Sequence, residues 1–494
     1  MSRALAAAPL SSFAFVAMLV LAEIAVRSGL ITDDTVRLWA GASTAADGAI
    51  SIGRIVAGYP TLPFLTTTFL AWLAPAGTPA PALVAAGLFA FVAAFCLHSF
   101  RNAGFSQAAA VAVTLLIALH PALLRAVIAG PADMFLAAFL LLLSLGLYDL
   151  RARSGTSEVM AVGLALMVLA FSHPLGAAFA FAAIPFLAFA VRPTLVADSA
   201  FNVVIALVFP TLFTVAAFCY VSWVFPGDGW SFFAAPTESL SLWTAAMARL
   251  FGNAASGMLA VDASMAMAAA LVLGAPVAVA MLVIVRHRRP LVLPAAVFAA
   301  AAVTATAISV ATGFFGDPTA IVIAAPILAA TVAARIPGAS DRTALVVTLL
   351  MLGWLGGLFS LALVDPITVG RLHAALDREG SERQDAVAAG GASLGHDGVL
   401  VDTDNAPAVV LGRGRARGLL GPQSEPFALA ILFSRIETPL IAVPDPQSVT
   451  GKNDRLNRAF PSLFRDGLPG YQVIYQNNTW HLLSRSPGLS ASNK

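Results

Sequence analysis

Two adjacent carboxylates, Asp33 and Asp34, follow the first apolar run of the sequence. Charge is costly deep in a membrane, so reactive ionisable groups are expected in a polar segment beside such a run. A carboxylate that faces a cavity could accept a proton from a nucleophile or hold that nucleophile in position. Adjacent side chains point in different directions, so we expect one of the two to be catalytic, with a preference for Asp34, which lies deeper in the polar segment. Alternatively, the pair could cap a helix or flank a membrane span.

The polar segment, residues 27–80, also contains two cations and a proline-rich turn. Arg37 and Arg54 follow the carboxylates, and residues 59–64 read Tyr-Pro-Thr-Leu-Pro-Phe. Tyr59 starts the turn, which precedes an apolar run.

A second group of polar residues lies further along the chain. His120, Arg125 and Asp133 are close in sequence, and His173 stands in the segment Phe171-Ser172-His173-Pro174. Asp133 follows Gly130-Pro131, and a proline followed by an acidic residue is also ordinary chemistry for the start of a helix. A His-Pro corner is likewise a common turn. Both a site and a structural role therefore remain open for these residues.

The composition indicates what kind of protein must position these groups. The chain has 494 residues, of which 59% are hydrophobic and 11% charged, and its mean hydropathy is +0.86. This composition predicts a polytopic α-helical membrane protein. Cys96 and Cys219 lie in apolar runs, which favours packing over a disulfide or a metal site. No basic stripe with interleaved aromatic residues is present, so nucleic acid is not expected as a partner.

Hydrophobic runs predict about eleven transmembrane helices. They lie near residues 9–26, 81–98, 107–123, 132–150, 158–173, 175–191, 200–224, 260–285, 291–311, 317–334 and 343–364. Residues 60–75 are apolar but shorter than the roughly 20 residues needed to cross, and are predicted to form a re-entrant or interfacial helix. With the N-terminus inside, ten arginines fall in inside segments and five in outside loops, which agrees with the positive-inside rule. The 27–80 loop and the C-terminus are then extracytoplasmic.

The composition changes near residue 365. Residues 365–494 contain 13 Lys/Arg and 13 Asp/Glu, about half of all charged residues, in short apolar runs separated by Gly, Pro and Asp. Residues 472–475 and 480–483 flank a Gln-Asn-Asn-Thr turn and are predicted to form a hairpin. We therefore expect a transmembrane domain over 1–364 and a C-terminal soluble α/β domain over 365–494.

The order of these features resembles the GT-C superfamily of polytopic glycosyltransferases, in the protein-mannosyltransferase and aminoarabinose-transferase-like branch. The resemblance covers about residues 10–190. It is carried by Asp33-Asp34 in the first extracytoplasmic loop, by the turn from Tyr59 to Phe64, and by Pro121, Arg125 and Asp133 leading into the fourth span.

The resemblance implies an inverting enzyme that moves a sugar from a polyprenyl-phosphate carrier to an extracytoplasmic glycan, lipid or protein acceptor of the cell envelope. Asp34 or Asp33 would be the base and Asp133 a second carboxylate near the acceptor. Arg54, Arg37 and Arg125 would bind the donor phosphate, and Tyr59 and His173 the substrate. No organic cofactor is expected, and a divalent metal requirement is left open. The Ala-rich, Lys-poor composition favours a bacterial inner membrane, so the partners are the bilayer and its lipid-linked sugars.

A non-enzymatic role is the alternative. The chain could be a non-catalytic GT-C-like protein or a carrier that assists polysaccharide assembly or export. Carriers usually show internal repeats and broken spans near the midplane. No repeat is evident in the sequence and the ionisable groups gather on one predicted face, which favours the enzyme.

Overall fold

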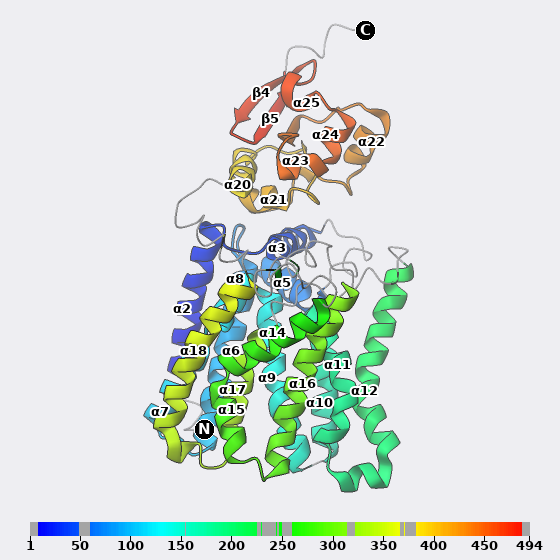
Figure 1. Ribbon diagram of the computed structural model, residues 1–494. Helices are drawn as coiled ribbons and strands as arrows, with labels where there is room; N and C mark the ends of the chain where they lie inside the picture. The colour runs from blue at the N-terminus through cyan, green and yellow to red at the C-terminus, as the bar shows by residue number, and fades with distance from the viewer. Residues whose placement is uncertain are drawn as a thin grey trace. The chain divides into compact units, whose positions relative to one another are not determined.

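The computed structural model shows that the protein is a helical membrane protein (Figure 1). Two compact units are distinguished, and each is described by itself. One contains residues 1–24, 52–63 and 82–370, and the other contains residues 25–51, 64–81 and 371–494. The residues that the structure describes are 8–48, 60–153, 155–224, 229, 244, 247–248, 259–313, 322–365, 370 and 382–486.

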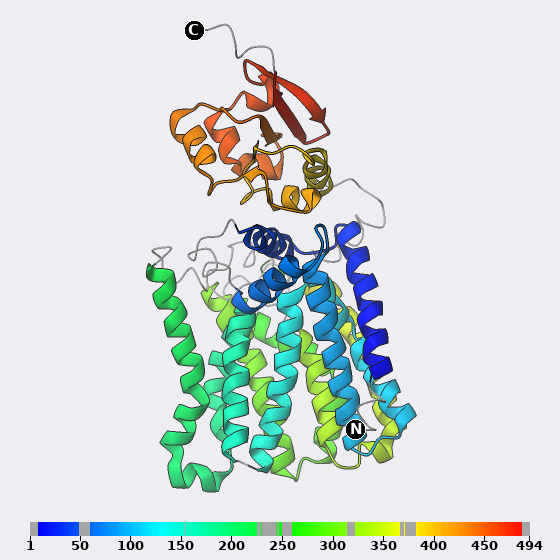
Figure 2. The same cartoon turned by 180° about the vertical axis from the view of Figure 1, so that it is seen from behind.

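Five helices among the described residues are long and apolar enough to cross a membrane. They are α6 (Ala80–Asn102), α9 (Pro131–Ala152), α12 (Pro193–Val224), α16 (Arg289–Thr312) and α18 (Thr343–Val364), the last preceded by the 3₁₀ turn η3 (Ser340–Arg342). The number rises to seven if each of two bent helix pairs is one span. Figure 2 shows α12 at one edge of the bundle, and only 22% of its most apolar stretch is buried inside the protein.

The bent pairs are α7 (Gln107–Ala118) with α8 (Pro121–Ala129), at 56°, and α14 (Leu259–Gly274) with α15 (Pro276–Ile284), at 79°. In each pair a proline is the first residue of the second helix. Proline has no N–H for the preceding turn and favours the first position of a helix, so the first helix ends and a new one starts in another direction. The sequence predicts a span over 107–123 and another over 260–285, and the structure shows that each of these intervals contains such a break.

Shorter apolar helices complete the set. They are α2 (Ala8–Arg27), α5 (Thr61–Leu73), α10 (Thr156–Ser172), α11 (Pro174–Ala190) and α17 (Ala324–Arg335). A helix thus lies in each of the eleven predicted intervals, but the count of eleven spans stays a prediction. The 13 residues of α5 are fewer than a straight crossing needs.

Small residues allow the helices of the first unit to approach closely. A Cβ atom on Gly163 of α10 would lie 3.0 Å from the carbonyl oxygen of Ala206 on α12. Helix α11 packs along α16, where the rings of Phe179 and Phe298 are 5.3 Å apart and fully buried. Van der Waals packing of small side chains is what holds helices together in lipid, where the hydrophobic effect between them is weak.

The second unit contains helix α3 (Asp33–Ala46), most of α5 and the C-terminal region. Five strands of that region form a mixed sheet in the order β2-β1-β3-β5-β4. They are β1 (Val399–Leu400), β2 (Leu419–Leu420), β3 (Leu440–Pro444), β4 (Tyr471–Gln476) and β5 (Trp480–Arg485). Strands β4 and β5 pair antiparallel across residues 477–479, which confirms the predicted hairpin.

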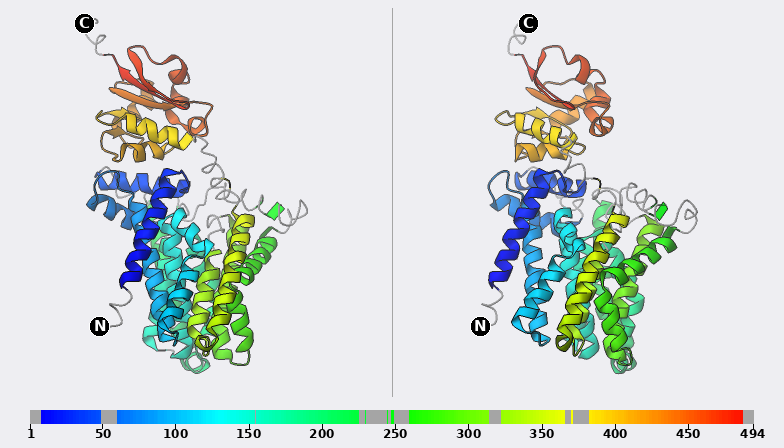
Figure 3. Two further views of the ribbon diagram at one scale, coloured as in Figure 1. Left: turned by 90° about the vertical axis from the view of Figure 1, so that its left-hand side faces the viewer. Right: turned by 60° about the vertical axis from the view of Figure 1, so that its left-hand side comes forward.

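Helices cover this sheet, and Figure 3 shows the strands in orange and red with α20 in yellow. The helices are α20 (Glu382–Ala392), α21 (Pro407–Arg413), α22 (Glu425–Phe433), α23 (Val449–Asn453), α24 (Arg455–Ala459) and α25 (Leu463–Asp466). Helix α20 packs against β4 and β5, and α23, α24 and α25 against β3. Strand β3 is buried along its whole length, so it is the centre of this part of the core.

Candidate functional site

The acidic pair lies in the first turn of α3 rather than in an irregular loop. Thr32 caps the helix, and its hydroxyl accepts a hydrogen bond from the backbone N–H of Thr35 at 3.3 Å. Negative charge is favourable at a helix N-terminus because the unpaired N–H groups and the helix dipole point there. The residue that caps α3 is therefore Thr32. Asp33 and Asp34, for which a capping role was one alternative, are the first two residues of the helix.

The two carboxylates have different partners. Arg383 of α20 forms an ion pair with Asp33, whose side chain is 59% exposed. The same guanidinium donates to the carbonyl oxygens of Ile31, at 2.6 Å, and Gly29, at 3.1 Å. Asp34 is 85% exposed, and Arg37, one turn further along α3, lies 3.8 Å from it. Asp33 is thus held by a bound cation, whereas most of the Asp34 carboxylate faces solvent.

Three predicted residues, Arg125, Asp133 and His173, meet in a buried network of the first unit. Arg125 Nη1 lies 2.5 Å from Asp133 Oδ2, and His173 Nε2 lies 3.1 Å from Asp133 Oδ1. Arg125 Nε also donates to Asp365 Oδ2 at 2.6 Å, from the residue that follows α18. All four side chains are between 6% and 11% exposed. The network joins α8, α9, α11 and the end of α18.

The hydrogen bonds of His173 indicate its tautomer. Its Nδ1 accepts a hydrogen bond from the backbone N–H of Leu175 at 3.0 Å and so caps α11. An accepting Nδ1 leaves the proton on Nε2, which then donates to Asp133. Asp133 therefore has one oxygen on the imidazole and the other on the guanidinium, an arrangement that fixes its orientation.

Asp365 was not among the predicted residues. It stands at the end of the last apolar run, before Pro366. An ionisable residue at such a place usually pairs with an opposite charge of the same protein, so its position was a usable signal. Its pairing with Arg125 means that two carboxylates share one guanidinium. A phosphate at Arg125 would therefore compete with these two carboxylates for the donors of the guanidinium.

His120 is close to this network in sequence but is not joined to it by a hydrogen bond among the described residues. It caps α8 by accepting, at Nδ1, a hydrogen bond from the N–H of Ala122 at 3.2 Å. Its imidazole lies against Gly274 at the end of α14 and Gly357 of α18. The two helix breaks therefore meet around one buried histidine.

The predicted donor and substrate residues Arg54 and Tyr59 lie outside the described residues. In the part of the chain that is described, no three His, Cys, Asp or Glu side chains are grouped so as to hold a metal ion.

The chain was compared with protein-family models, with curated proteins and with solved structures, and nothing matches it.

Proposed function

We propose that this protein is an inverting membrane glycosyltransferase that uses a polyprenyl-phosphate-linked sugar and an extracytoplasmic envelope acceptor. The supporting observation is the exposed carboxylate of Asp34 in the first turn of α3, soon after the apolar helix α2. A general base must come within hydrogen-bond reach of the proton that it accepts, and Asp34 is accessible to an acceptor whereas Asp133 is enclosed by Arg125 and His173. No organic cofactor is required by this chemistry.

The step consists of one displacement. An acceptor hydroxyl oxygen attacks the anomeric carbon, its proton passes to Asp34, and the bond between that carbon and the phosphate oxygen breaks. The polyprenyl phosphate leaves as an anion, and arginine donors stabilise the charge as it develops. We assign this stabilisation to Arg37 and Arg54, with Arg125 a third candidate once a carboxylate partner is exchanged. Asp133, oriented by His173, would position the acceptor, and Tyr59 the substrate.

The proposed membrane arrangement has eleven spans in a bacterial inner membrane, with the C-terminal α/β domain outside the cytoplasm. It is supported by the placement of arginines and by α5, whose exposed side chains Leu65, Phe69 and Leu73 form one stripe that suits the outer interface. Reporter fusions after Arg289 and after Pro366 are expected to score cytoplasmic and extracytoplasmic, respectively. The reverse pattern would place Asp34 on the wrong face and exclude the proposal.

The function is tested by transfer with purified full-length protein in nanodiscs. Polyprenyl phosphate charged in turn with radiolabelled hexoses and pentoses is the donor, and envelope extract of the producing cells is the acceptor. Asp34→Asn keeps the shape of the side chain and removes its charge, so turnover should fall about 10²–10⁴-fold with an unchanged melting temperature. The matched control is Asp397→Asn, which changes a carboxylate 93% exposed and 3.6 Å from an arginine.

A carrier is the second candidate, favoured by the two broken helix pairs that meet at His120. Broken helices at membrane depth line the substrate sites of many carriers. If the wild-type protein releases no polyprenyl phosphate with any donor, but moves a lipid-linked sugar across a liposome bilayer, the carrier is the better assignment.

A further inference from the structure

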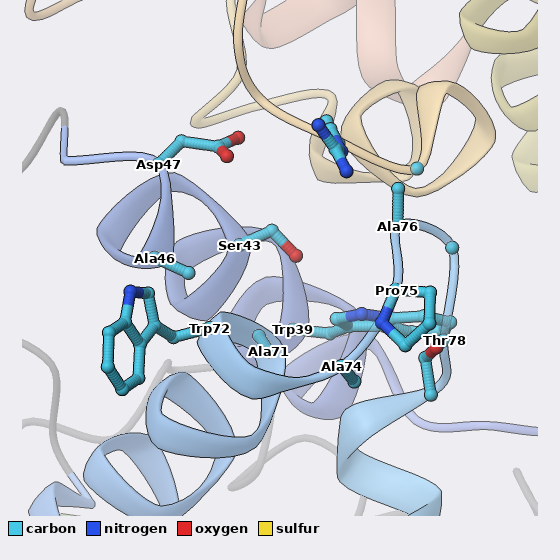
Figure 4. A pocket seen from close by; sticks show the side chains of 13 residues that line it. Trp39, Ser43, Ala46, Asp47, Ala71, Trp72, Ala74, Pro75, Ala76 and Thr78 are labelled. Carbon is cyan, nitrogen blue, oxygen red and sulfur yellow. The ribbon is translucent and has the colours of Figure 1, made fainter.

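A small cavity lies within the second unit. Its volume is about 210 Å³, and its walls come from the C-terminal half of α3, the end of α5 with the following loop, and the loop after α21 (Figure 4). Pockets that enclose drug-sized ligands are larger, about 300–1,000 Å³. The space therefore suits one small ring or one unit of a longer chain.

The walls are fixed by hydrogen bonds between segments far apart in the sequence. The N–H of Gly77 donates to the carbonyl oxygen of Gly414 at 3.2 Å. Asp47 Oδ2 accepts hydrogen bonds from the N–H groups of Ala416, at 2.8 Å, and Arg417, at 3.0 Å. Gly414 has a φ of +72° and lies so close to Gly77 that a Cβ atom would be 3.3 Å from its backbone, so glycine is suited to this position. The cavity is thus formed in advance of any ligand.

Several polar groups in the cavity have unused hydrogen-bonding capacity. The hydroxyls of Ser43 and Thr78 and the guanidinium of Arg415 line it, and none has a side-chain partner among the described residues. The second oxygen of Asp47 is likewise without a partner in the described part of the chain. Donors and acceptors are both present, and the charges of Asp47 and Arg415 balance. A neutral ligand with many hydroxyl groups would satisfy this set, because each hydroxyl both donates and accepts.

Two indole rings complete the lining. Figure 4 shows Trp39 extending toward Pro75 and Thr78, and Trp72 beside Ala46. Trp39 is buried, whereas Trp72 is 67% exposed. The negative face of an aromatic ring attracts the polarised C–H groups on the face of a sugar ring, and Trp combines an apolar surface with an N–H donor.

We propose that this cavity binds a neutral saccharide unit of the acceptor, which makes the acceptor a glycan. This inference rests on the proposed transferase function and names its substrate class. A lipid phosphate fits less well, because the carboxylate of Asp47 would repel it in the same cavity.

The test measures binding, so it does not require turnover. The probes are size-fractionated neutral oligosaccharides, released by mild acid from the envelope polysaccharide of the producing cells and labelled at the reducing end. Equilibrium dialysis against full-length protein in nanodiscs should find at least one fraction bound. Trp72→Ala and Arg415→Gln should each weaken that binding about tenfold or more, and Ser43→Leu, which fills the cavity, should abolish it.

Matched controls separate the cavity from general effects. Trp223→Ala removes an indole of similar exposure, 64%, and Arg417→Gln removes an exposed cation two residues from Arg415 that does not line the cavity. Both should bind within twofold of wild type. The proposal is overturned if no fraction binds the wild-type protein, or if the cavity variants match the controls. It is also overturned if those variants instead lose affinity for vesicles that contain polyprenyl phosphate. A failure of the proposed function would appear separately, as unchanged transfer by Asp34→Asn.

Discussion

Asp34 and Asp133 are both carboxylates in the first turn of a helix, yet their surroundings are opposite. Asp133 is 11% exposed and has a guanidinium on one oxygen and an imidazole on the other. Asp34 is 85% exposed, and Arg37 lies 3.8 Å from it. A buried ion pair must be matched closely to offset its desolvation, so it restrains structure and gives up its partners with difficulty. An exposed carboxylate can exchange protons readily, which is what a base requires.

The largest expected effect comes from breaking the buried network. Arg125→Met leaves Asp133 and Asp365 without their shared cation, and loss of one partner from a buried pair costs about 3–5 kcal/mol. We expect a large drop in the melting temperature of the detergent-solubilised protein. The matched control is Arg335→Met, which removes a guanidinium 2.8 Å from Asp149 in a pair about one-third exposed. That change should cost about 1 kcal/mol or less, and equal melting temperatures for the two variants would contradict the structural role of the network.

A third carboxylate, Asp454, extends the comparison between Asp34 and Asp133, because it is buried beside another carboxylate instead of a cation. Asp454 and Asp402 are fully buried, and each caps α24 with one oxygen. Their other oxygens, Asp454 Oδ2 and Asp402 Oδ1, have no partner among the described residues. Burial, with a smaller contribution from Asp402, raises the pKa of Asp454 from 3.8 to about 7. A proton on Asp454 would remove one of these two buried charges.

The folded state therefore binds this proton more tightly than the unfolded chain does. The stability that proton binding at Asp454 contributes is fully present below pH 4. It is lost as the pH rises to about 7, and the free energy of unfolding falls by up to about 4 kcal/mol over that range. Hydrogen-exchange protection of β3 amides in the full chain should fall across that window. Asp454→Asn keeps a good capping residue and should remove the pH dependence, whereas the control Asp445→Asn should retain it. Equal pH profiles for both variants would show that Asp454 does not carry the proton.

The smallest expected effect comes from Asp33. Its carboxylate is largely exposed and its cation also holds two backbone carbonyls, so Asp33→Asn should cost less than about 1 kcal/mol of stability. Turnover should fall less than tenfold. Arg383→Gln, which removes all three interactions, should lower hydrogen-exchange protection in the first turn of α3 more than Asp33→Asn does. A loss of turnover in Asp33→Asn as large as in Asp34→Asn would assign the base to Asp33.

Hydrophobic runs predict helices well where the run is long and uninterrupted. The predicted spans at 81–98 and 132–150 correspond to α6 and α9, because apolar residues in lipid must satisfy their backbone groups within the helix. The breaks before Pro121 and Pro276 were missed, since a hydropathy pattern does not distinguish a bent span from a straight one. A proline at that position was the available signal.

The candidate site was predictable only in its local parts. Arg125 and Asp133 are eight residues apart and were grouped from sequence, but Asp365 is 240 residues from Arg125 and joins it through packing of the bundle. Arg383 and Asp33 are 350 residues apart in sequence, and the packing of the second unit brings them together. Long-range ion pairs depend on tertiary geometry, which one sequence does not display.

The fit between His120 and Gly357 limits how this protein can diverge. A Cβ atom at position 357 would lie 2.5 Å from the imidazole Cε1, and one at position 274 would lie 2.9 Å from the Cβ of Ala325. All the atoms that a Cβ at 357 would meet belong to His120, whose imidazole is buried where α7, α8, α14 and α18 meet, so the ring cannot simply turn out into solvent. In descendants of this sequence, any side chain gained at 357 should be accompanied by a smaller residue at 120, so the two positions are expected to change together over evolutionary time.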